Sequence, residues 1–302
     1  MSLVPGWMPP TRERWEVLVG AWQLFYPILG NLQWLINWYG MGKTSKESRF
    51  NIPGRIAWFT MEAPGFLTLL YIMKTLPAQH GITDLPWQNR VLAGLFLTDT
   101  SSKIKVIHYS YRAVLFPYLQ PSMAPIHFLV WGFALSFQIC NATSLGCWLA
   151  AYGPTTDEAW AATGPFATAR FVLGIGVFYF GLAGNFFHDE ELREIRRSEQ
   201  RRQEKLIKQA GGEKKKADVT KHYRIPEAGL FRYMLYPHYL CEWVEWAGFW
   251  LAAGWGCVPA RAFLINEVTT MFPRAVKGKW WYVEKFGEEK VGKKWAVLPG
   301  IY

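Results

Sequence analysis

The stretch GNFFHDEELREIR, residues 184–196, joins the end of an apolar run to a strongly basic segment. Residues three or four apart share one face of a helix, so a helix here aligns four polar side chains on one stripe: Asn185, Asp189, Arg193 and Arg196. The stripe offers an amide, a carboxylate and two guanidinium groups at a boundary between membrane and cytosol. These groups suit a ribose and its phosphates; the alternative is a helix end that carries solvated charge.

The composition around this stretch is that of a membrane protein. Of 302 residues, 51% are hydrophobic, 17% aromatic and only 19% charged, and the chain contains 17 Trp. Trp and Tyr concentrate at membrane interfaces, and the apolar residues occur in blocks long enough to span a bilayer. The net charge of +10 lies largely in segments of cytosolic type, so we interpret it as a topology signal and not as a nucleic-acid surface.

The cysteines indicate neither a metal site nor a disulfide framework. All four lie in apolar runs without metal-type spacing, as buried apolar residues do: Cys140, Cys147, Cys241 and Cys257. The amino terminus has no pattern of a cleavable signal peptide, so we expect the first span itself to direct membrane insertion.

We expect an all-α fold, a polytopic integral membrane protein with about seven transmembrane helices. The expected spans are the runs 15–38, 56–76, 89–116, 123–151 and 165–187, a semi-polar segment around 237–246, and the run 247–272. Lys and Arg are frequent after the first and fifth spans and in the tail 273–302, whereas the loop 153–164 has none. The positive-inside rule then places the amino terminus outside the cytosol and the carboxyl terminus in it.

We treat residues 1–302 as one membrane domain. Its amino-terminal spans, 15–190, are expected to enclose a substrate, and its carboxyl-terminal part, 185–302, to bind a cofactor. Segment 193–224 is rich in Lys and Arg and has two glycines in its middle, which predicts a mobile, helical loop in the cytosol.

Some polar side chains fall inside the expected spans and need a reason to be there. Glu62 lies in the second span, where a carboxylate at the bilayer centre costs about 2.5–3.5 kcal/mol on insertion scales. It is therefore a functional candidate, unless it only bonds another helix. The third span contains Asp99, Lys103, His108 and Tyr109, which cannot all face lipid, so part of it must line a wet or enclosed cavity.

Two nucleotide-binding motifs are excluded. Gly42-Lys43-Thr44 resembles half of a phosphate-binding loop, but the full pattern requires Gly where the chain has Asn37. A Rossmann site is also excluded, because no Gly-x-Gly-x-x-Gly follows a predicted strand.

Four blocks of the sequence resemble the steroid 5α-reductase family of membrane enone reductases. Residues 57–66 are similar to the family's Trp-Phe-x-x-Glu-x-Pro-x-Phe block, and residues 108–112 to its His-Tyr-x-x-Arg block. The stripe within 184–196 matches the family's nicotinamide-cofactor helix at each named position. The fourth block, 223–246, begins with Tyr-Arg-Ile-Pro and ends with Glu-x-x-Glu-Trp. The matches span most of residues 55–302.

The resemblance implies NADPH-dependent reduction of the C4–C5 double bond of 3-oxo-4-ene steroids. Glu62 is expected to help hold the 3-oxo group, Tyr109 to donate to the same oxygen, and Trp58 to line the flat apolar substrate. Hydride would pass to the β carbon of the enone, while Tyr109 stabilises the negative charge that develops on the ketone oxygen. A proton from solvent would complete the reduction at the neighbouring carbon.

The resemblance also implies a set of NADPH contacts: Asn185, Asp189, Arg193, Arg196, Tyr223, Arg224, His238, Glu242, Arg274 and Tyr282. Guanidinium groups suit the phosphates because they bind them bidentately. The chain departs from the family pattern at two places. His238 stands where many relatives have Asn, and Lys277-Gly278-Lys279 stands where they often have His, so the replacement of these groups is open.

The alternative is another reductase of the same superfamily, acting on enoyl-CoA in very-long-chain fatty-acid elongation or on polyprenol. A short polar arm before the first span argues against the former, whereas Pro-His-Tyr-Leu-x-Glu at 237–242 also resembles polyprenol reductases. A methyltransferase would leave Glu62 and Tyr109 without a role. A non-enzyme scaffold would tolerate changes at Glu62, Asp189 and Glu242. We expect a monomer in the endoplasmic reticulum membrane, with a steroid-like enone and the bilayer as partners, and with no nucleic acid or metal.

Overall fold

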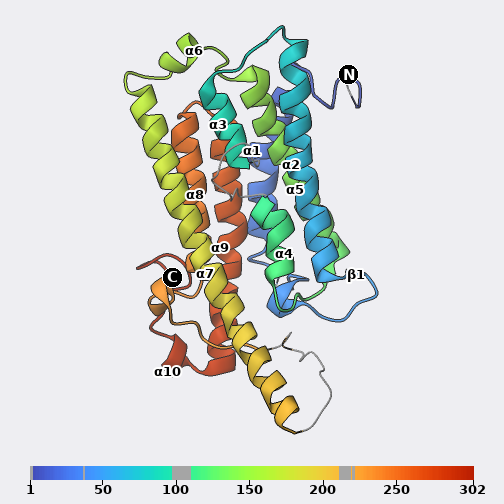
Figure 1. Ribbon diagram of the computed structural model, residues 1–302, viewed down its shortest axis with the longest axis vertical. Helices are drawn as coiled ribbons and strands as arrows, with labels where there is room; N and C mark the ends of the chain where they lie inside the picture. The colour runs from blue at the N-terminus through green and yellow to red at the C-terminus, as the bar shows by residue number, and fades with distance from the viewer. Residues whose placement is uncertain (1–2, 37, 97–109, 211–218, 220–221) are drawn as a thin grey trace.

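The computed structural model describes residues 3–36, 38–96, 110–210, 219 and 222–302, and it confirms the all-α prediction (Figure 1). Its α-helices are α1 (Arg12–Leu32), α2 (Gly54–Gln79), α3 (Trp87–Phe96), α4 (Phe116–Leu119), α5 (Phe128–Cys147), α6 (Asp157–Ala161), α7 (Ala167–Gln209), α8 (Pro237–Ala253), α9 (Val258–Phe286) and α10 (Glu288–Val291). Shorter helical turns occupy Gly42–Thr44, Ser110–Leu115, Trp148–Tyr152 and Gly229–Arg232. The strands β1 (Asn51–Ile52) and β2 (Ile126–His127) pair antiparallel, with Asn51 opposite His127.

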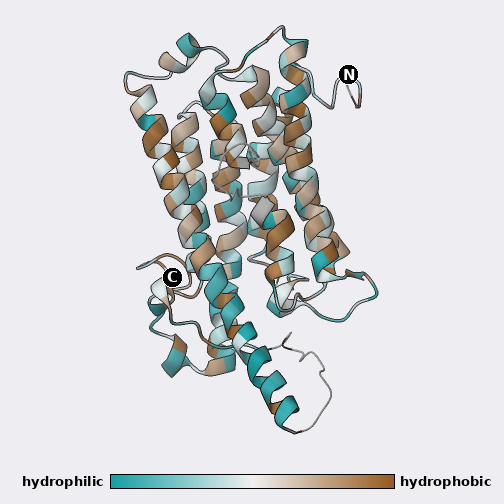
Figure 2. Cartoon of the chain, viewed as in Figure 1, coloured by the Kyte–Doolittle hydropathy of each residue, from teal (hydrophilic) through white to brown (hydrophobic). Residues whose placement is uncertain are grey.

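Within the described residues, three helical segments are long and apolar enough to cross a membrane: Gly54–Gln79, Phe128–Tyr152 and Ala167–Gln209. The long helices run side by side along the vertical axis of Figure 1. Figure 2 shows apolar residues along the bundle and hydrophilic residues where α7 continues below it. The fold is that of an all-α membrane protein, while the number of about seven spans and their orientation stay predictions.

Helix α7 carries the stretch 184–196 and is continuous from Ala167 to Gln209. The segment from 193 onward, expected to be a mobile, helical loop, is helical up to Gln209. Ion pairs along the helix support this extension: Arg202 lies 2.8 Å from Glu199, three residues earlier. Part of the predicted mobile region, 211–218 and 220–221, lies outside the described residues.

Glycines let α7 and α8 approach so closely that their backbones touch. A Cβ added at Gly181 of α7 would lie 2.3 Å from the backbone nitrogen of Glu245, and one at Gly248 of α8 would lie 2.3 Å from that of Phe178. A larger residue cannot be accommodated at either position without separating the helices, as at other small-residue contacts between membrane helices. This contact holds the polar stripe of α7 against the first turns of α8.

The expected span 247–272 is wrong in its bounds, because a turn divides it. Helix α8 ends at Ala253, and the next residue, Gly254, has a φ of +97°, which glycine adopts most easily. Helix α9 begins at Val258, with Pro259 in its first turn, where a proline N–H is not needed. Because α9 continues to Phe286, Arg274 and Tyr282 lie on a helix and not in a tail.

The core of the bundle contains an aromatic cluster contributed by α1, α5, α8 and α9. Trp22 packs against Tyr26 and Phe137, with ring centroids 4.8 and 4.9 Å apart. Phe263 lies 5.7 Å from Phe137 and 4.5 Å from Trp246 by the same measure. These large buried rings brace the helices around a neighbouring cavity.

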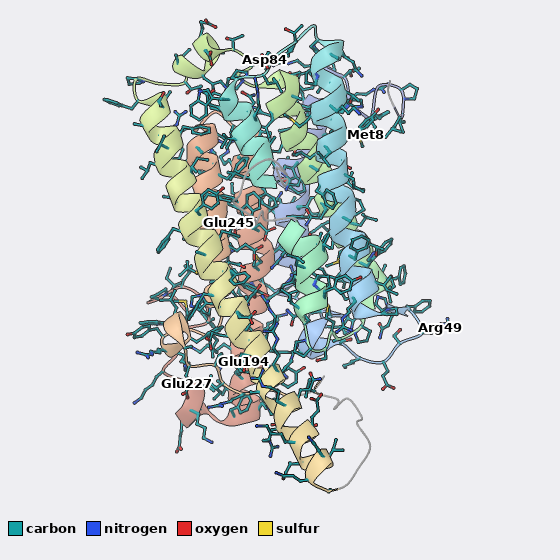
Figure 3. The ribbon with its side chains drawn as sticks, viewed as in Figure 1. Met8, Arg49, Asp84, Glu194, Glu227 and Glu245 are labelled. Atoms are coloured by element: carbon teal, nitrogen blue, oxygen red, sulfur yellow. The ribbon has the colours of Figure 1, made fainter. Side chains whose placement is uncertain are left out.

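The charged residues labelled in Figure 3 separate into the ends and the middle of the bundle. Asp84 lies at one end, and Arg49, Glu194 and Glu227 lie toward the other, whereas Glu245 lies at mid-height. Glu245 is fully buried beside the α7–α8 contact. Acidic residues of α8 therefore face the interior of the bundle.

Candidate functional site

A cavity of about 660 Å³ lies between α1, α2, α5, α7, α8 and α9. Its volume is within the range of small-molecule sites, roughly 300–1,000 Å³. Part of its lining is apolar: Leu29, Met61, Val130, Phe133, Phe137 and Phe263. Another part carries four cations, which we call the cationic part: Lys43, Arg196, Arg224 and Arg274. Such a lining suits an apolar ligand together with an anionic one.

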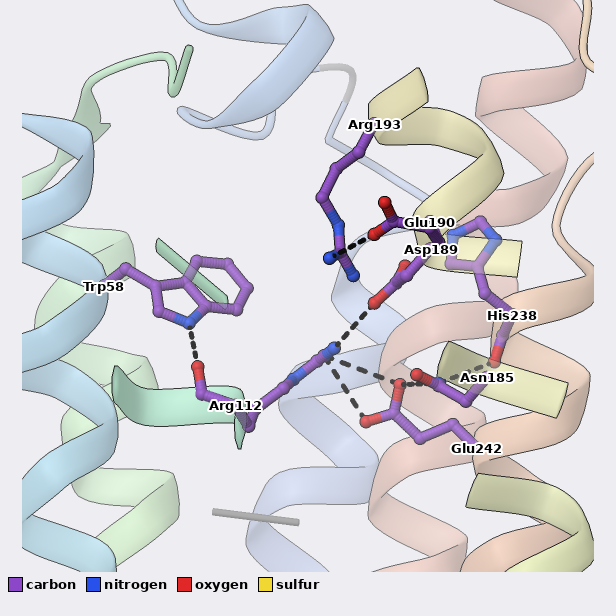
Figure 4. A network of polar contacts seen from close by, with 8 residues as sticks. All are labelled: Trp58, Arg112, Asn185, Asp189, Glu190, Arg193, His238 and Glu242. Carbon is purple, nitrogen blue, oxygen red and sulfur yellow. Dashed lines mark hydrogen bonds and ion pairs between the residues drawn. The ribbon is translucent and has the colours of Figure 1, made fainter. Parts of the chain in front are cut away.

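Arg112 links the elements around this cavity (Figure 4). Its guanidinium lies 3.4 Å from Glu242 Oε1 on α8 and 3.8 Å from Asp189 Oδ2 on α7. Glu242 and Asp189 are only 4% and 7% exposed, so screening by water is weak there. The indole Nε1 of Trp58 on α2 donates to the backbone oxygen of Arg112 at 2.9 Å, which ties this segment to α2.

Asn185 stands behind Glu242 and does not line the cavity. Its buried amide donates to Glu242 Oε2 at 3.3 Å and to the backbone oxygen of His238 at 3.0 Å. These bonds join α7 to the first turns of α8 and orient the Glu242 carboxylate. His238 does line the cavity, and its buried Nδ1 has no hydrogen-bond partner among the residues that the structure describes, so a bound ligand can satisfy it.

Glu62 lines the apolar part of the cavity from α2 and is 6% exposed. The side-chain amide of Gln138 on α5 donates to its Oε2 atom. Trp58, one turn earlier on α2, also lines the cavity and stacks on Phe116 with ring centroids 4.9 Å apart. Tyr109, the expected partner of Glu62, lies outside the described residues, so the pairing of these two side chains stays a prediction.

The arginines of the cationic part have few acceptors of their own. Arg196 donates to the backbone oxygen of Ser122 at 3.3 Å, and Arg274 donates to Gln33 Oε1 at 3.0 Å. Among the described residues, neither these two nor Arg224 forms an ion pair with a carboxylate. Arginines that form no ion pair of their own suit an anionic ligand.

Lys43 lines the cavity too, although its Gly-Lys-Thr motif is not a phosphate-binding loop. Its ammonium lies 3.8, 4.9 and 5.1 Å from the ring centroids of Tyr282, Trp281 and Tyr236, and it donates to the Tyr236 hydroxyl at 3.2 Å. Burial, and then the charge of Arg196, lower the pKa of Lys43 well below its ordinary value. The isolated Gly-Lys-Thr was the signal in the sequence, but only the fold brings this lysine close to Arg196.

The remaining expected cofactor residues differ in their positions. Tyr223 and Tyr282 line the cavity. Arg193 does not, because its fully buried guanidinium pairs with Glu190 at 2.7 Å. Lys277, which stands near the family's usual His, donates to the backbone oxygens of Gln33 and Ile36, and thereby ties α9 to the segment that follows α1.

Glu267 and Gln138 line the cavity and are absent from the sequence-based set. Glu267 lies on α9, and no hydrogen bond or ion pair joins it to the described residues. Both are polar residues within apolar runs, which is the signal that selected Glu62. A search of every expected span for polar residues within apolar runs therefore finds Glu267 and Gln138.

Comparisons with known proteins agree with this arrangement. The profile of a family described as 3-oxo-5-alpha-steroid 4-dehydrogenase matches residues 123–302, more than half of the chain. An uncharacterized protein of Schizosaccharomyces pombe is 32% identical over 273 residues, which cover 85% of this chain and 89% of that protein. Steroid 5-alpha-reductase DET2 of Solanum lycopersicum is 28% identical over 282 residues, 92% of each chain. The 3-oxo-5-alpha-steroid 4-dehydrogenase 1 of Homo sapiens is 28% identical over 254 residues, 84% of this chain and 82% of that protein.

Proposed function

Because this chain belongs to the 3-oxo-5-alpha-steroid 4-dehydrogenase family, and is thus an oxidoreductase, we propose that it reduces the C4–C5 double bond of 3-oxo-4-ene steroids with NADPH. One observation carries the proposal: the same cavity is lined by the buried Glu62 carboxylate and by the cationic part. An apolar ketone and an anionic dinucleotide can therefore meet inside the bundle. A non-enzyme scaffold has no need for this combination.

The cationic part fits a phosphorylated dinucleotide. Phosphates would relieve the repulsion between neighbouring cations such as Lys43 and Arg196, and guanidinium groups can bind them bidentately. The carboxylates of Asp189 and Glu242 and the imidazole of His238 suit the hydroxyl and amide groups of such a ligand. When bound, NADPH would supply the hydride that reaches the β carbon of the enone.

The apolar part fits the ketone end of the substrate. Glu62 and Tyr109 would hold the 3-oxo group, and the Tyr109 hydroxyl would donate to the oxygen on which negative charge develops. One donor of this kind contributes about 2.7–4 kcal/mol to transition-state stabilisation. Trp58 would cover the flat substrate, and its bond to the Arg112 backbone supports its orientation. Solvent would supply the proton to the neighbouring carbon.

The cellular setting belongs to the same proposal. We propose a multi-pass protein of the endoplasmic reticulum membrane with a cytosolic carboxyl terminus. The apolar helices support its place in a membrane. NADPH would then reach the cationic part from the cytosol, and the apolar substrate would come from the bilayer. We propose that one chain is sufficient for the reaction.

A panel of unsaturated substrates tests the proposal. Purified protein in detergent is mixed with NADPH and with a 3-oxo-4-ene steroid, an enoyl-CoA or a polyprenol, and NADPH oxidation is followed. We expect turnover with the steroid and a product heavier by two hydrogens. Turnover with only one of the other two would assign the enzyme to the alternative reductases. No turnover with any of them, and no change in melting temperature when NADPH is added, would contradict the reductase proposal.

A single substitution tests the assignment of the ketone end. Tyr109→Phe removes the hydroxyl and keeps the ring, so we expect steroid turnover to fall by about 10²–10³-fold while NADPH affinity stays nearly unchanged. The measurements are steady-state kinetics and a fluorescence titration with NADPH. An equal loss of turnover and of NADPH affinity would mean that the role is misassigned.

A further inference from the structure

Gln138 and Glu62 form a polar pair between two apolar helices. Gln138 lies on α5 between Phe137 and Ile139, and Glu62 lies on α2. Both side chains line the cavity, and the Gln138 amide donates to Glu62 Oε2. A hydrogen bond to a charged group is stronger than one between neutral groups, so this bond constrains the direction of the carboxylate.

The packing of the two helices holds the pair in place. Gly65 lies three residues after Glu62, on the same face of α2. A Cβ added at Gly65 would lie 3.1 Å from the Cβ atom of Gln138, so α5 approaches α2 closely just beside the pair. The Gln138 amide is therefore held by the helix packing and not by a flexible loop.

A second hydrogen bond joins the same two helices outside the cavity, and it provides a structural control. Trp131 Nε1 on α5 donates to Thr60 Oγ1 on α2 at 2.9 Å. Neither Trp131 nor Thr60 lines the cavity. The Trp131–Thr60 bond therefore joins α2 to α5 outside the cavity, whereas the Gln138–Glu62 bond acts on a carboxylate inside it.

We propose that Gln138 is a positioning residue for the enone reduction, because its amide fixes the Glu62 carboxylate in the direction from which it holds the ketone end of the substrate. This inference rests on the proposed function, which assigns the ketone end to Glu62. With one carboxylate oxygen bound to the amide, the direction of the other is set as well. Without that bond the carboxylate loses one of the contacts that fix its direction, and the near-attack geometry of the ketone is lost in part of the population.

Four variants test the proposal: Gln138→Leu, Thr60→Val, Glu62→Gln and the double variant Q138L/E62Q. Leucine keeps the volume at 138 and removes the donor. We expect Q138L to lower kcat/KM for the steroid about 10–100-fold, as loss of a charged hydrogen bond does, with NADPH affinity and Tm close to those of the native protein. T60V breaks the neighbouring link between the same helices and should keep the native rate.

A double-mutant cycle distinguishes positioning from a general structural effect. If Gln138 acts through Glu62, Q138L lowers the residual rate of E62Q less than about twofold, measured in single turnovers with excess enzyme. If the two substitutions lower the rate independently, so that their fold-losses multiply in Q138L/E62Q, the proposal is overturned. A native rate in Q138L would also overturn it. If Q138L does not fold, Gln138→Asn decides, because its shorter amide cannot reach Glu62. A native rate in E62Q would instead remove Glu62 from the proposed function, which is a separate failure.

Discussion

Replacing Arg112 by Met should destabilise the protein more than any exchange of a surface charge. The guanidinium lies 3.4 Å from Glu242 and 3.8 Å from Asp189, and at an effective dielectric constant of about 20 each attraction is about 4–5 kcal/mol before desolvation. Removing one member of a buried ion pair typically costs about 3–5 kcal/mol, because the remaining charge stays buried without its partner. Here two carboxylates lose that partner at once, so we expect a loss near the upper end of this range.

The assay is a thermal melt of the purified protein in detergent, with Arg90→Met as the matched control. Arg90 pairs with Asp84 at the surface, where the two side chains are 59% and 82% exposed, and such pairs contribute about 0–1 kcal/mol. We expect R112M to lower Tm by on the order of 5–15 °C, and R90M to lower it by no more than about 3 °C. The double variant R112M/E242Q should recover part of the loss in Tm, because it also removes the charge of the buried Glu242 carboxylate. Equal shifts in R112M and R90M would refute the reasoning about the buried network.

Three further predictions concern packing and cofactor binding. Gly181→Ala should lower Tm sharply, because the added Cβ would lie 2.3 Å from a backbone nitrogen of α8, whereas Gly176→Ala, with nothing within 4 Å, should leave Tm unchanged. The pKa of Lys43 is lowered in the free protein and should rise beside a phosphate, so Lys43 should take up a proton when NADPH binds. The affinity for NADPH should therefore fall as the pH rises from the pKa of Lys43 in the free protein to its pKa in the complex. Calorimetry in two buffers measures this uptake, and Lys43→Met should abolish it. Gly278→Ala should weaken NADPH binding, since its Cβ would lie 1.7 Å from the Tyr236 hydroxyl that contacts Lys43; native affinity would contradict this.

The stripe on α7 is the part of the site that local sequence spacing describes best. Asn185 faces α8 and Asp189 faces the cavity because a continuous helix carries both, and helical spacing is a local property. Arg193 departs from this pattern, since Glu190, three residues earlier on the same helix, captures its guanidinium. Spacing alone therefore predicts the face of a helix but not the competition between side chains on it.

The contacts that complete the site depend on segments far apart in the chain. The bonds Gln138–Glu62, Arg112–Glu242 and Lys43–Tyr236 join residues 76, 130 and 193 positions apart. No periodicity or propensity encodes such pairings, so the sequence predicts the polar residues but not their partners. The boundary between α8 and α9 is an intermediate case, because Gly254 and Pro259 indicate it while the hydropathy of 247–272 hides it.

The transfer of hydride to the β carbon of an enone is the central claim, and deuterium labelling measures it directly. The protein is incubated with a 3-oxo-4-ene steroid and NADPH deuterated at C4 of the nicotinamide, with each of the two C4 diastereomers in turn. We expect one diastereomer to yield a saturated ketone with a single deuterium at C5, located by mass spectrometry and NMR. A product without deuterium at C5 from either diastereomer, or no reduced steroid at all, would contradict it.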